Sequence, residues 1–274
     1  MTNNTATATT AHIEHDWETA GKAWGAGAND WACLFEHYSH DVLAAILQRS
    51  AVGADTHLLD IACGSGWALR HAEGMGTTTA GIDAAPALID IARERVPNSD
   101  LRVGSMFDLP WADDSFDVVT SINGIWGGCE PALVEAFRVL KPGGEIGISF
   151  WGDGKPFDLR SAFIVFAMNS PEWHLGGMKK TNKIAYPGVA ESMLEAAGFE
   201  VTERGQRIST LEWPDEETAW RAMASVGPAI PAIDNVGRDV LRPQVIEAME
   251  PCRTRLGGFR FRNDHHFVMA CKPG

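Results

Sequence analysis

The fold is decided by the stretch Leu58-Leu59-Asp60-Ile61-Ala62-Cys63-Gly64-Ser65-Gly66, in which an apolar run leads into a loop of small residues. A second apolar run, Thr79-Ala80-Gly81-Ile82-Asp83, follows and ends in a carboxylate. Together they predict a buried strand, a glycine turn into a helix, and a second strand with an acid at its tip. Such a unit binds an adenosine-containing cofactor at the carboxyl edge of a parallel sheet.

Strand and helix patterns alternate outward from this stretch. We expect short buried strands at 57–62, 77–83, 101–103, 116–122 and 145–151. Apolar residues at helical spacing predict helices at 67–73, 87–95 and 130–140. The last helix should stop at Lys141-Pro142-Gly143-Gly144, because proline and glycine end helices. This alternation predicts a doubly wound α/β sheet with mostly parallel strands.

The flanking segments complete a single predicted domain over residues 1–274, because no repeat or linker divides the chain. We expect a disordered tail at 1–11, a helical cap at 12–50, a cofactor-binding core at 55–151 and a substrate-side insertion at 152–186. The part at 187–274 should add helices at 187–197, 216–226 and 236–249, and strands at 199–213 and 260–271.

Composition and charge argue against several classes of partner and site. Hydrophobic residues make up 45% of the 274 residues, which suffices for a full core, and the net charge is −13. A chain this acidic repels phosphate backbones, so we expect no nucleic-acid partner. No apolar run reaches the roughly 18 residues that span a bilayer, and residues 1–11 lack a signal-peptide pattern, so we expect no membrane partner. The five cysteines are scattered, which favours a reducing cytoplasm and argues against a disulfide framework or a metal site.

The glycine spacing separates two classes of adenosine cofactor. A dinucleotide site needs three glycines in the pattern G-x-G-x-x-G, and here Ala68 stands beyond Gly64 and Gly66 without a third glycine in place. Asp60, just before the turn, would repel a pyrophosphate but could accept from an ammonium group. Asp83 follows Asp60 by 23 residues, the usual distance for the acid that holds ribose hydroxyls. A cofactor with a cationic amino-acid end therefore fits better than NAD.

The ordered set of motifs resembles class I S-adenosylmethionine-dependent methyltransferases of the ubiquinone/menaquinone-biosynthesis-like small-molecule type. Residues 58–66 match the first motif and Gly81-Ile82-Asp83 the second. Further matches are Asp108-Leu109-Pro110-Trp111, Asp114-Ser115-Phe116-Asp117-Val118-Val119 and Arg138-Val139-Leu140-Lys141-Pro142-Gly143-Gly144. The resemblance covers about residues 55–151, with a looser match at Trp24-Gly25 and Asp30-Trp31-Ala32. It implies a seven-stranded Rossmann-like sheet with an antiparallel last strand, and it is compatible with a homodimer.

The resemblance also implies roles for individual residues toward S-adenosyl-L-methionine and its product S-adenosyl-L-homocysteine. The methionine part would meet Asp60 and the loop residues Ala62, Cys63, Gly64, Ser65 and Gly66. Asp83 would hold the ribose hydroxyls. The adenine would lie among Ala84, Ser105, Met106 and Phe107. Asn123 would meet the methionine amino group through its backbone carbonyl, Trp126 would close the site near the sulfonium, and Trp24 would contribute from the cap.

The chain departs from the family pattern at two places. Ser105 stands where the family usually has an aspartate that accepts from the adenine amino group, so this contact would be uncharged and weaker. The segment 123–129, Asn-Gly-Ile-Trp-Gly-Gly-Cys, lacks the frequent histidine after the fourth strand. If that histidine deprotonates the substrate in relatives, its task here falls to another residue or is not needed.

Methyl transfer from a sulfonium is an in-line displacement in which the protein mainly aligns the reactants and excludes water. A base is needed only if the methyl acceptor must lose a proton. The preferred catalytic candidate is His174 in the aromatic insertion, followed by His37 in the cap. Adjacent histidines on the last strand should point to opposite faces, one of them exposed. The other candidates are Tyr38, Glu130, His265 and His266.

The ten tryptophans and other apolar rings predict an aromatic-lined pocket for a hydrophobic or aromatic small molecule, which would be methylated on O, N or C. The rings are Trp24, Trp31, Phe35, Trp126, Trp151, Phe157, Phe163, Phe166 and Trp173. The main alternative is a protein of the same fold that binds the cofactor but catalyses a cyclisation or rearrangement. An NAD-dependent oxidoreductase and a thiol-based arsenite methyltransferase are the weaker readings.

Overall fold

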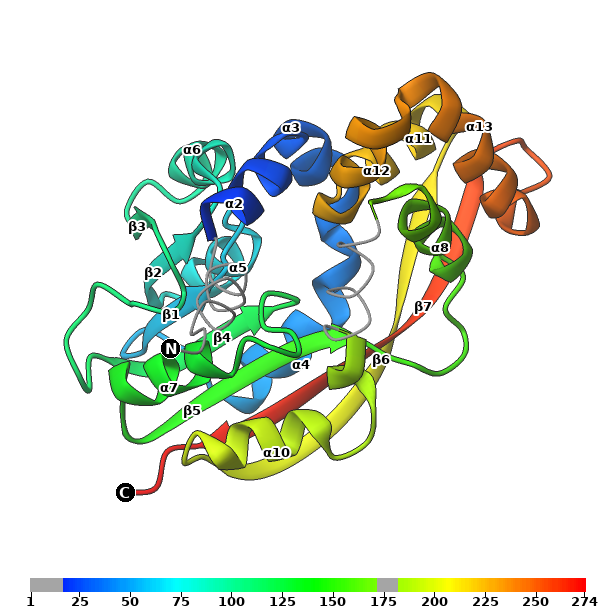
Figure 1. Cartoon of the computed structure of the whole chain (residues 1–274). Helices are drawn as coiled ribbons and strands as arrows, with labels where there is room; N and C mark the ends of the chain where they lie inside the picture. The colour runs from blue at the N-terminus through cyan, green and yellow to red at the C-terminus, as the bar shows by residue number, and fades with distance from the viewer. Residues whose placement is uncertain (1–16, 172–181) are drawn as a thin grey trace, which may run out of the picture.

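The computed structural model describes residues 17–171 and 182–274, so the predicted tail at 1–11 and the residues Trp173 and His174 lie outside the described part. Seven strands form one sheet in the order β3-β2-β1-β4-β5-β7-β6 (Figure 1). The strands are β1 (His57–Ile61), β2 (Thr78–Asp83), β3 (Asp100–Val103), β4 (Phe116–Ile122), β5 (Leu140–Trp151), β6 (Glu200–Trp213) and β7 (Phe259–Cys271). The first five are parallel, and β7 runs antiparallel to both β5 and β6. This confirms the predicted seven-stranded sheet with an antiparallel last strand.

The order of the strands creates a crevice at one edge of the sheet. β1 pairs with β2 on one side and with β4 on the other, so the strand order reverses between them. In open α/β sheets ligands bind beyond the carboxyl ends of the strands at such a reversal. Asp60 near the end of β1, Asp83 at the end of β2 and Ile122 at the end of β4 therefore lie at one edge.

Helices cover both faces of the sheet. One apolar cluster joins the inward side chains of β1 and β4 to α4 (His40–Arg49), α5 (Trp67–Glu73) and α6 (Pro86–Arg95). Another cluster joins the opposite face to α7 (Glu130–Val139) and α10 (Val189–Ala196). Figure 1 shows α7 and α10 on one side of the sheet and α4 on the other. Pro86 occupies the first turn of α6, where its missing N–H costs no hydrogen bond.

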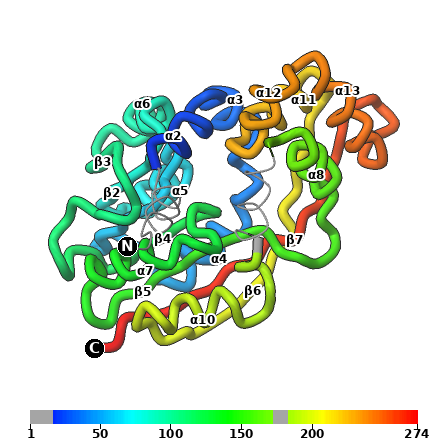
Figure 2. Tube along the Cα trace, in the orientation of Figure 1, coloured from blue at the N-terminus to red at the C-terminus, as the bar shows by residue number. Residues whose placement is uncertain are grey.

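A second layer of helices stands beyond the carboxyl edge, where β6 and β7 extend past the other strands (Figure 2). The N-terminal cap consists of α2 (Trp17–Gly25), α3 (Ala28–Asp30), the π-helix η1 (Trp31–Phe35) and the 3-10 helix η2 (Glu36–Ser39). The other helices are α8 (Arg160–Asn169), α11 (Glu216–Ala224), α12 (Ile230–Val236) and α13 (Arg238–Met249), with the short helices η3 (Asn182–Ala185), η4 (Gly227–Ala229) and η5 (Glu250–Cys252). Most of these helices share one apolar cluster with the outer ends of β6 and β7, whereas η3 packs in the cluster of α7 and α10.

Two predictions about local structure were wrong, and a third was right apart from its first residues. The helix α7 does end before 141–144, at Val139, but the fifth strand, expected at 145–151, already begins at Leu140, which pairs with Phe116. The helix expected at 236–249 is α13, which begins two residues later, at Arg238, because Gly237 adopts a φ of 83° and separates it from α12. Neither His265 nor His266 is exposed, since the elements around β7 cover both of its faces at this point.

No helix within residues 17–171 and 182–274 combines the length and the apolar character needed to cross a bilayer. None of the five cysteines, all of which fall in the described ranges, forms a disulfide. Cys63 is buried under the glycine loop, and burial raises the pKa of its thiol. The scattered cysteines therefore contribute no cross-link to the fold.

Close packing between β5 and α4 gives a test of the sheet. A methyl group added at Gly147 would lie 2.4 Å from Ile46 Cγ2 and 3.1 Å from Met269 Sδ. We expect Gly147→Ala to lower the free energy of unfolding by about 1–3 kcal/mol, because overpacking forces the helix or the strand to shift. Urea denaturation measures this. In the control Gly53→Ala the added methyl group meets no atom nearer than 4.0 Å, and equal stability of the two variants would contradict the packing.

Candidate functional site

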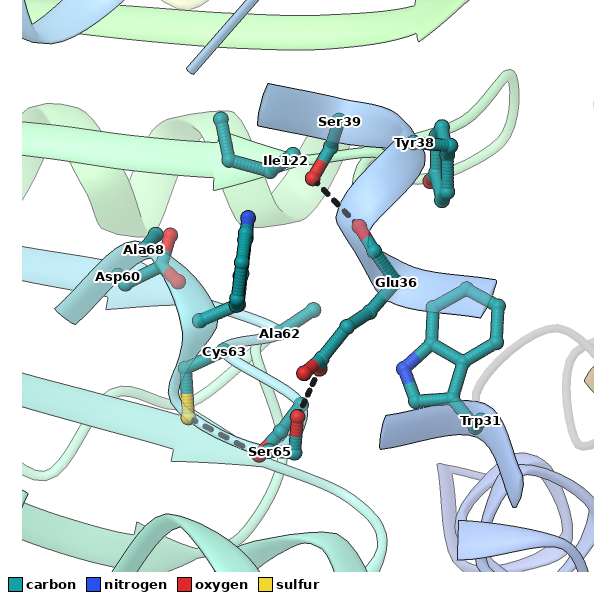
Figure 3. A pocket seen from close by; sticks show the side chains of 12 residues that line it. Trp31, Glu36, Tyr38, Ser39, Asp60, Ala62, Cys63, Ser65, Ala68 and Ile122 are labelled. Atoms are coloured by element: carbon teal, nitrogen blue, oxygen red, sulfur yellow. Dashed lines mark hydrogen bonds between the residues drawn. The ribbon is translucent and has the colours of Figure 1, made fainter. Parts of the chain in front are cut away.

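A cavity of about 50 Å³ lies between the glycine loop and the N-terminal cap. From the sheet side it is lined by Asp60, Ala62, Cys63, Gly64, Ser65, Trp67, Ala68 and Ile122. From the cap it is lined by Trp31, Glu36, Tyr38 and Ser39, and Figure 3 shows these two sets of side chains facing each other. The cavity therefore brings together five of the residues that the resemblance assigned to the cofactor: Asp60, Ala62, Cys63, Gly64 and Ser65.

The loop after β1 has an unusual backbone. Ala62 has a φ of 58°, and Gly64 and Gly66 have φ values of 55° and 80°. A non-glycine residue in the left-handed region costs free energy, and such residues concentrate at ligand sites. Gly66 has a packing role, because a methyl group there would lie 3.1 Å from Ala92 Cβ on α6. The loop turns sharply at Ala62 and Gly64 and then lets α5 approach α6 at Gly66.

Asp60 is a buried acid at the floor of the cavity, with only 2% of its surface exposed. Its Oδ1 accepts a hydrogen bond of 2.7 Å from the Thr120 hydroxyl. Burial raises the pKa of Asp60 to about 7; the Thr120 hydrogen bond opposes this rise and the charge of Asp83 adds to it. A cation bound beside this carboxyl would lower its pKa and favour its ionised form.

Asp83 connects the glycine loop after β1 (residues 62–66, called the cofactor loop below) to the start of α6. Its Oδ2 accepts from the backbone N–H of Gly64 at 2.8 Å, and its Oδ1 accepts from the N–H of Ala85 at 2.8 Å. Burial raises the pKa of this carboxyl, while the backbone N–H groups oppose the rise. Asp60 and Asp83 thus stand at the ends of neighbouring strands, as their spacing in the sequence predicted.

A buried ion pair fastens the cap to the same loop. The Glu36 carboxylate in η2 accepts from the Ser65 hydroxyl and from the Arg95 guanidinium (Figure 3 shows the contact with Ser65). Arg95 Nη1 also donates to Ser65 Oγ at 2.8 Å, and Nη2 donates to the carbonyl oxygen of Ala32 at 3.0 Å. Burial raises the pKa of Glu36, although Ser65 and Arg95 both counteract this. We call Glu36, Ser65 and Arg95 the cap clamp.

The remaining assigned cofactor residues lie outside this cavity. A methyl group added at Gly21 would lie 2.0 Å from the carbonyl oxygen of Ala84, so α2 crosses directly over Ala84. The Ser105 hydroxyl accepts from the N–H of Phe107 at 3.1 Å, and Met106 and Phe107 pack against the core below. Trp126 is half-buried after β4. Trp24 belongs to the aromatic cluster of the cap, with its ring edge-on to Trp31 at 4.9 Å.

Most of the predicted aromatic pocket does gather in one place. Phe35 and Phe166 are buried in the outer apolar cluster, and five further rings pack against it: Trp24, Trp31, Trp151, Phe157 and Phe163. Trp31 stacks on Phe35 at 5.1 Å, and Trp151 stacks on Phe157 at 5.7 Å. Of the two preferred bases, His37 is exposed on η2, and His174 lies outside the described residues. Both stay predictions.

Sequence reasoning missed several residues of the site. Glu36 and Arg95 are 59 positions apart, and nothing in either local pattern marks them as partners. Trp67 directly follows the last glycine of the loop, and its Nε1 is buried with no hydrogen-bond partner in the described part of the chain. For Trp67 the sequence did offer a signal, because an aromatic N–H stands at the start of the helix that directly follows the glycine loop.

The raised pKa of Asp60 predicts a pH dependence of stability. A carboxyl whose pKa is higher in the folded state than in the unfolded state stabilises the fold at low pH and loses this contribution as pH rises. We expect the stability of Asp60→Asn relative to wild type to increase between about pH 4 and pH 7 and then to level off, a change of about 2–4 kcal/mol. Urea denaturation across this range measures it. Asp90→Asn on exposed α6 is the control, and a flat difference would contradict the burial of Asp60.

The cap clamp predicts coupling between Glu36 and Arg95. We expect Arg95→Met to cost about 3–5 kcal/mol of stability, because it leaves the buried Glu36 carboxylate unpaired. Adding Glu36→Gln should recover part of this loss, which a double-mutant cycle in urea would measure. Arg93→Met, at an exposed position of the same helix, should change stability little. Additive effects of the two clamp substitutions would show that the pair is not coupled.

Comparison with known proteins identifies a family for the part of the chain around the glycine loop. Residues 59–148 match the family model for the methyltransferase domain. The chain is 28% identical over 181 residues to a demethylmenaquinone methyltransferase of Renibacterium salmoninarum, covering 65% of this chain and 69% of that protein. It is 26% identical over 235 residues to a malonyl-[acyl-carrier protein] O-methyltransferase of Serratia marcescens, covering 83% and 85%.

Solved structures share the fold. The crystal structure of the [4+2]-cyclase SpnF superposes with a TM-score of 0.59 at 17% identity, covering 94% of both chains. The YcgJ protein of Bacillus subtilis superposes with a TM-score of 0.57 at 17% identity, covering 86% of this chain and 99% of that one. At such identities the likeness concerns the fold alone. The matched family model, the sequence relatives and the shared sheet identify residues 59–148 as a class I S-adenosylmethionine-dependent methyltransferase domain.

Proposed function

We propose that this enzyme transfers the methyl group of S-adenosylmethionine to O, N or C of a hydrophobic or aromatic small molecule held under the cap. The observation that carries the proposal is that the cofactor loop and the aromatic cluster meet. Trp31 and Tyr38 line the cavity at the loop and also belong to the outer apolar cluster or pack against it. An acceptor among these rings would therefore lie next to the cofactor's methionine end.

The polar groups of the cavity suit the two charged ends of the methionine part. The Asp60 carboxyl would ionise beside the ammonium group, since a neighbouring cation favours the charged form. The unpaired Trp67 N–H supplies a donor for the carboxylate. Asp83 would take the ribose hydroxyls, Ala84, Ser105, Met106 and Phe107 the adenine, and Ala62, Cys63, Gly64, Ser65 and Gly66 the backbone of the loop. Asn123, Trp126 and Trp24 complete the proposed set.

Binding requires the cap to move. The cavity measures about 50 Å³, whereas sites for small ligands usually measure roughly 300–1,000 Å³. α2 also lies over Ala84, where the adenine is proposed to bind. We infer that the cap lifts from the loop to admit the cofactor and closes over it, excluding water from the transfer. Lid movements of this kind are common in enzymes that must keep a reactive centre dry.

The chain's own contribution to the reaction is alignment. The sulfonium supplies an activated methyl group, so the residues around it need to hold the acceptor atom in line and keep water out. A base is required only for an acceptor that loses its proton during the transfer. His174 and His37 are the proposed bases for such an acceptor.

The acidic chain and its free cysteines bear on partners and location. A net charge of −13 disfavours nucleic-acid substrates. Five unpaired cysteines fit a reducing compartment, and we place the enzyme in the cytoplasm with a small molecule as its substrate. A homodimer is compatible with this proposal.

Turnover tests the function. The protein is incubated with S-adenosylmethionine and small-molecule extracts, and mass spectrometry follows S-adenosylhomocysteine and acceptors that gain one CH₂. Methyl transfer yields both in equal amounts. Product formation without S-adenosylhomocysteine would instead support the alternative, a cyclisation or rearrangement in which the cofactor is not consumed. Binding of NAD in place of S-adenosylmethionine would contradict both.

Asp83 gives a quantitative test of the cofactor site. We expect Asp83→Ala to weaken binding of S-adenosylhomocysteine by about 1–3 kcal/mol, the cost of losing hydrogen bonds to a charged acceptor. Isothermal titration calorimetry measures the dissociation constant, and circular dichroism verifies the fold. Asp90→Ala, on the exposed side of the adjoining helix, is the matched control. An unchanged dissociation constant in Asp83→Ala would refute the ribose assignment.

A further inference from the structure

Four side chains form a continuous chain of hydrogen bonds beside the aromatic cluster. Asn123 Nδ2 lies 2.5 Å from the Tyr38 hydroxyl, and Asn123 Oδ1 lies 3.0 Å from His265 Nε2. His265 Nδ1 in turn lies 2.9 Å from Ser209 Oγ. The chain connects the cap to β4, β7 and β6, and its members Tyr38, Ser209 and His265 are buried.

The orientation of the Asn123 amide sets the direction of every hydrogen bond in the chain. The Asn123 amide directs its oxygen to His265, so His265 Nε2 must carry a hydrogen. Burial lowers the pKa of His265 to about 3, so the ring is neutral and its Nδ1 accepts from the Ser209 hydroxyl. The Asn123 NH₂ group then donates to the Tyr38 oxygen. All hydrogens point from β6 toward the cap.

Tyr38 therefore ends the chain with its own hydrogen unused. Its oxygen already receives the Asn123 N–H, and no acceptor for its O–H occurs among the residues that the structure describes. The ring is held firmly, because it stacks on Trp151 at 4.5 Å and on His265 at 5.4 Å. Tyr38 also lines the cavity that reaches Asp60. A buried hydroxyl with an unused hydrogen requires a partner.

We propose that Tyr38 donates this hydrogen to the methyl acceptor, and that the acceptor is a small molecule bearing an oxygen that accepts hydrogen bonds, such as a carbonyl or carboxylate. This deepens the proposed function and rests on it. Tyr38 contacts the acceptor, while Asn123, His265 and Ser209 are positioning residues that fix the orientation of its hydroxyl. Burial raises the pKa of Tyr38 well above its ordinary value, so the residue acts as a neutral donor and not as the base.

The first experiment examines the direction of the chain without any acceptor. Nitrogen-15 NMR of the full-length protein, labelled at histidine, distinguishes the two neutral tautomers of His265. We expect the form protonated on Nε2 throughout the range of pH 5–9. In Ser209→Ala the Nδ1 loses its donor but Nε2 keeps Asn123 Oδ1 as its acceptor, so the Nε2-protonated form should persist. An Nδ1-protonated or a charged ring in the wild type would overturn the proposal.

The second experiment uses two probes of nearly equal shape, acetophenone and α-methylstyrene, of which only the ketone can accept a hydrogen bond. Binding to the protein saturated with S-adenosylhomocysteine is followed by ligand-observed NMR. We expect acetophenone to bind about twofold to tenfold more tightly, the range for one neutral hydrogen bond. Tyr38→Phe should remove this preference, and because Tyr38 also lines the cavity at the cofactor loop, the variant is saturated according to its own dissociation constant for S-adenosylhomocysteine. Tyr186→Phe, at the chain's other and exposed tyrosine, should keep the preference.

The outcomes separate this proposal from the proposed function. If both probes bind equally well to the wild type, the aromatic site stands and Tyr38 is not its donor. The same holds if Tyr38→Phe keeps the preference for the ketone. If neither probe binds, the aromatic cluster is not the acceptor site, and both proposals fail. Should Tyr38→Phe not fold, the tautomer of His265 in the wild type still decides the direction of the chain.

Discussion

The site depends on one buried ion pair. Glu36 and Arg95 come from the cap and from the end of α6, and Ser65 between them belongs to the cofactor loop. Through this cap clamp, an irregular N-terminal segment that forms no part of the sheet is held against its carboxyl edge. Buried charges of this kind contribute little net stability, but they permit few alternative arrangements. The clamp thereby sets where Trp31 and Tyr38 lie relative to Asp60.

Three apolar clusters position the residues of the site. The clusters around the sheet hold Asp60 and Asp83 at the ends of neighbouring strands, the arrangement on which the proposed cofactor site rests. The outer cluster, built on the long ends of β6 and β7, supplies the rings. Because β7 runs antiparallel to β5, it also carries His265 back to the strand ends, next to Asn123. The site between these clusters is thus built from residues, such as Asn123 and His265, that are far apart in the sequence.

The core of the fold and half of the site could be predicted from the sequence, because both are set by local patterns. Periodicity located β1, β4 and α5 within about one residue, and the spacing of Asp60 and Asp83 placed them at one edge. The start of β5 and the break at Gly237 were not predicted. The pairing of Leu140 with Phe116 begins the strand early, and the positive φ of Gly237 separates α12 from α13. The cap clamp and the Tyr38 chain could not be foreseen, because each joins segments whose approach only the folded structure defines.

The position of the cap has a thermodynamic consequence. Residues of η1 and η2 form one wall of the cavity at the cofactor loop and at the same time belong to the aromatic cluster. A ligand that holds this shared wall closed on one side does so for the other side as well. Once the first ligand has closed the cap, the second ligand binds without the free-energy cost of closing it. Each ligand therefore raises the affinity for the other by the same factor. The proposed function therefore includes cooperative binding of cofactor and acceptor.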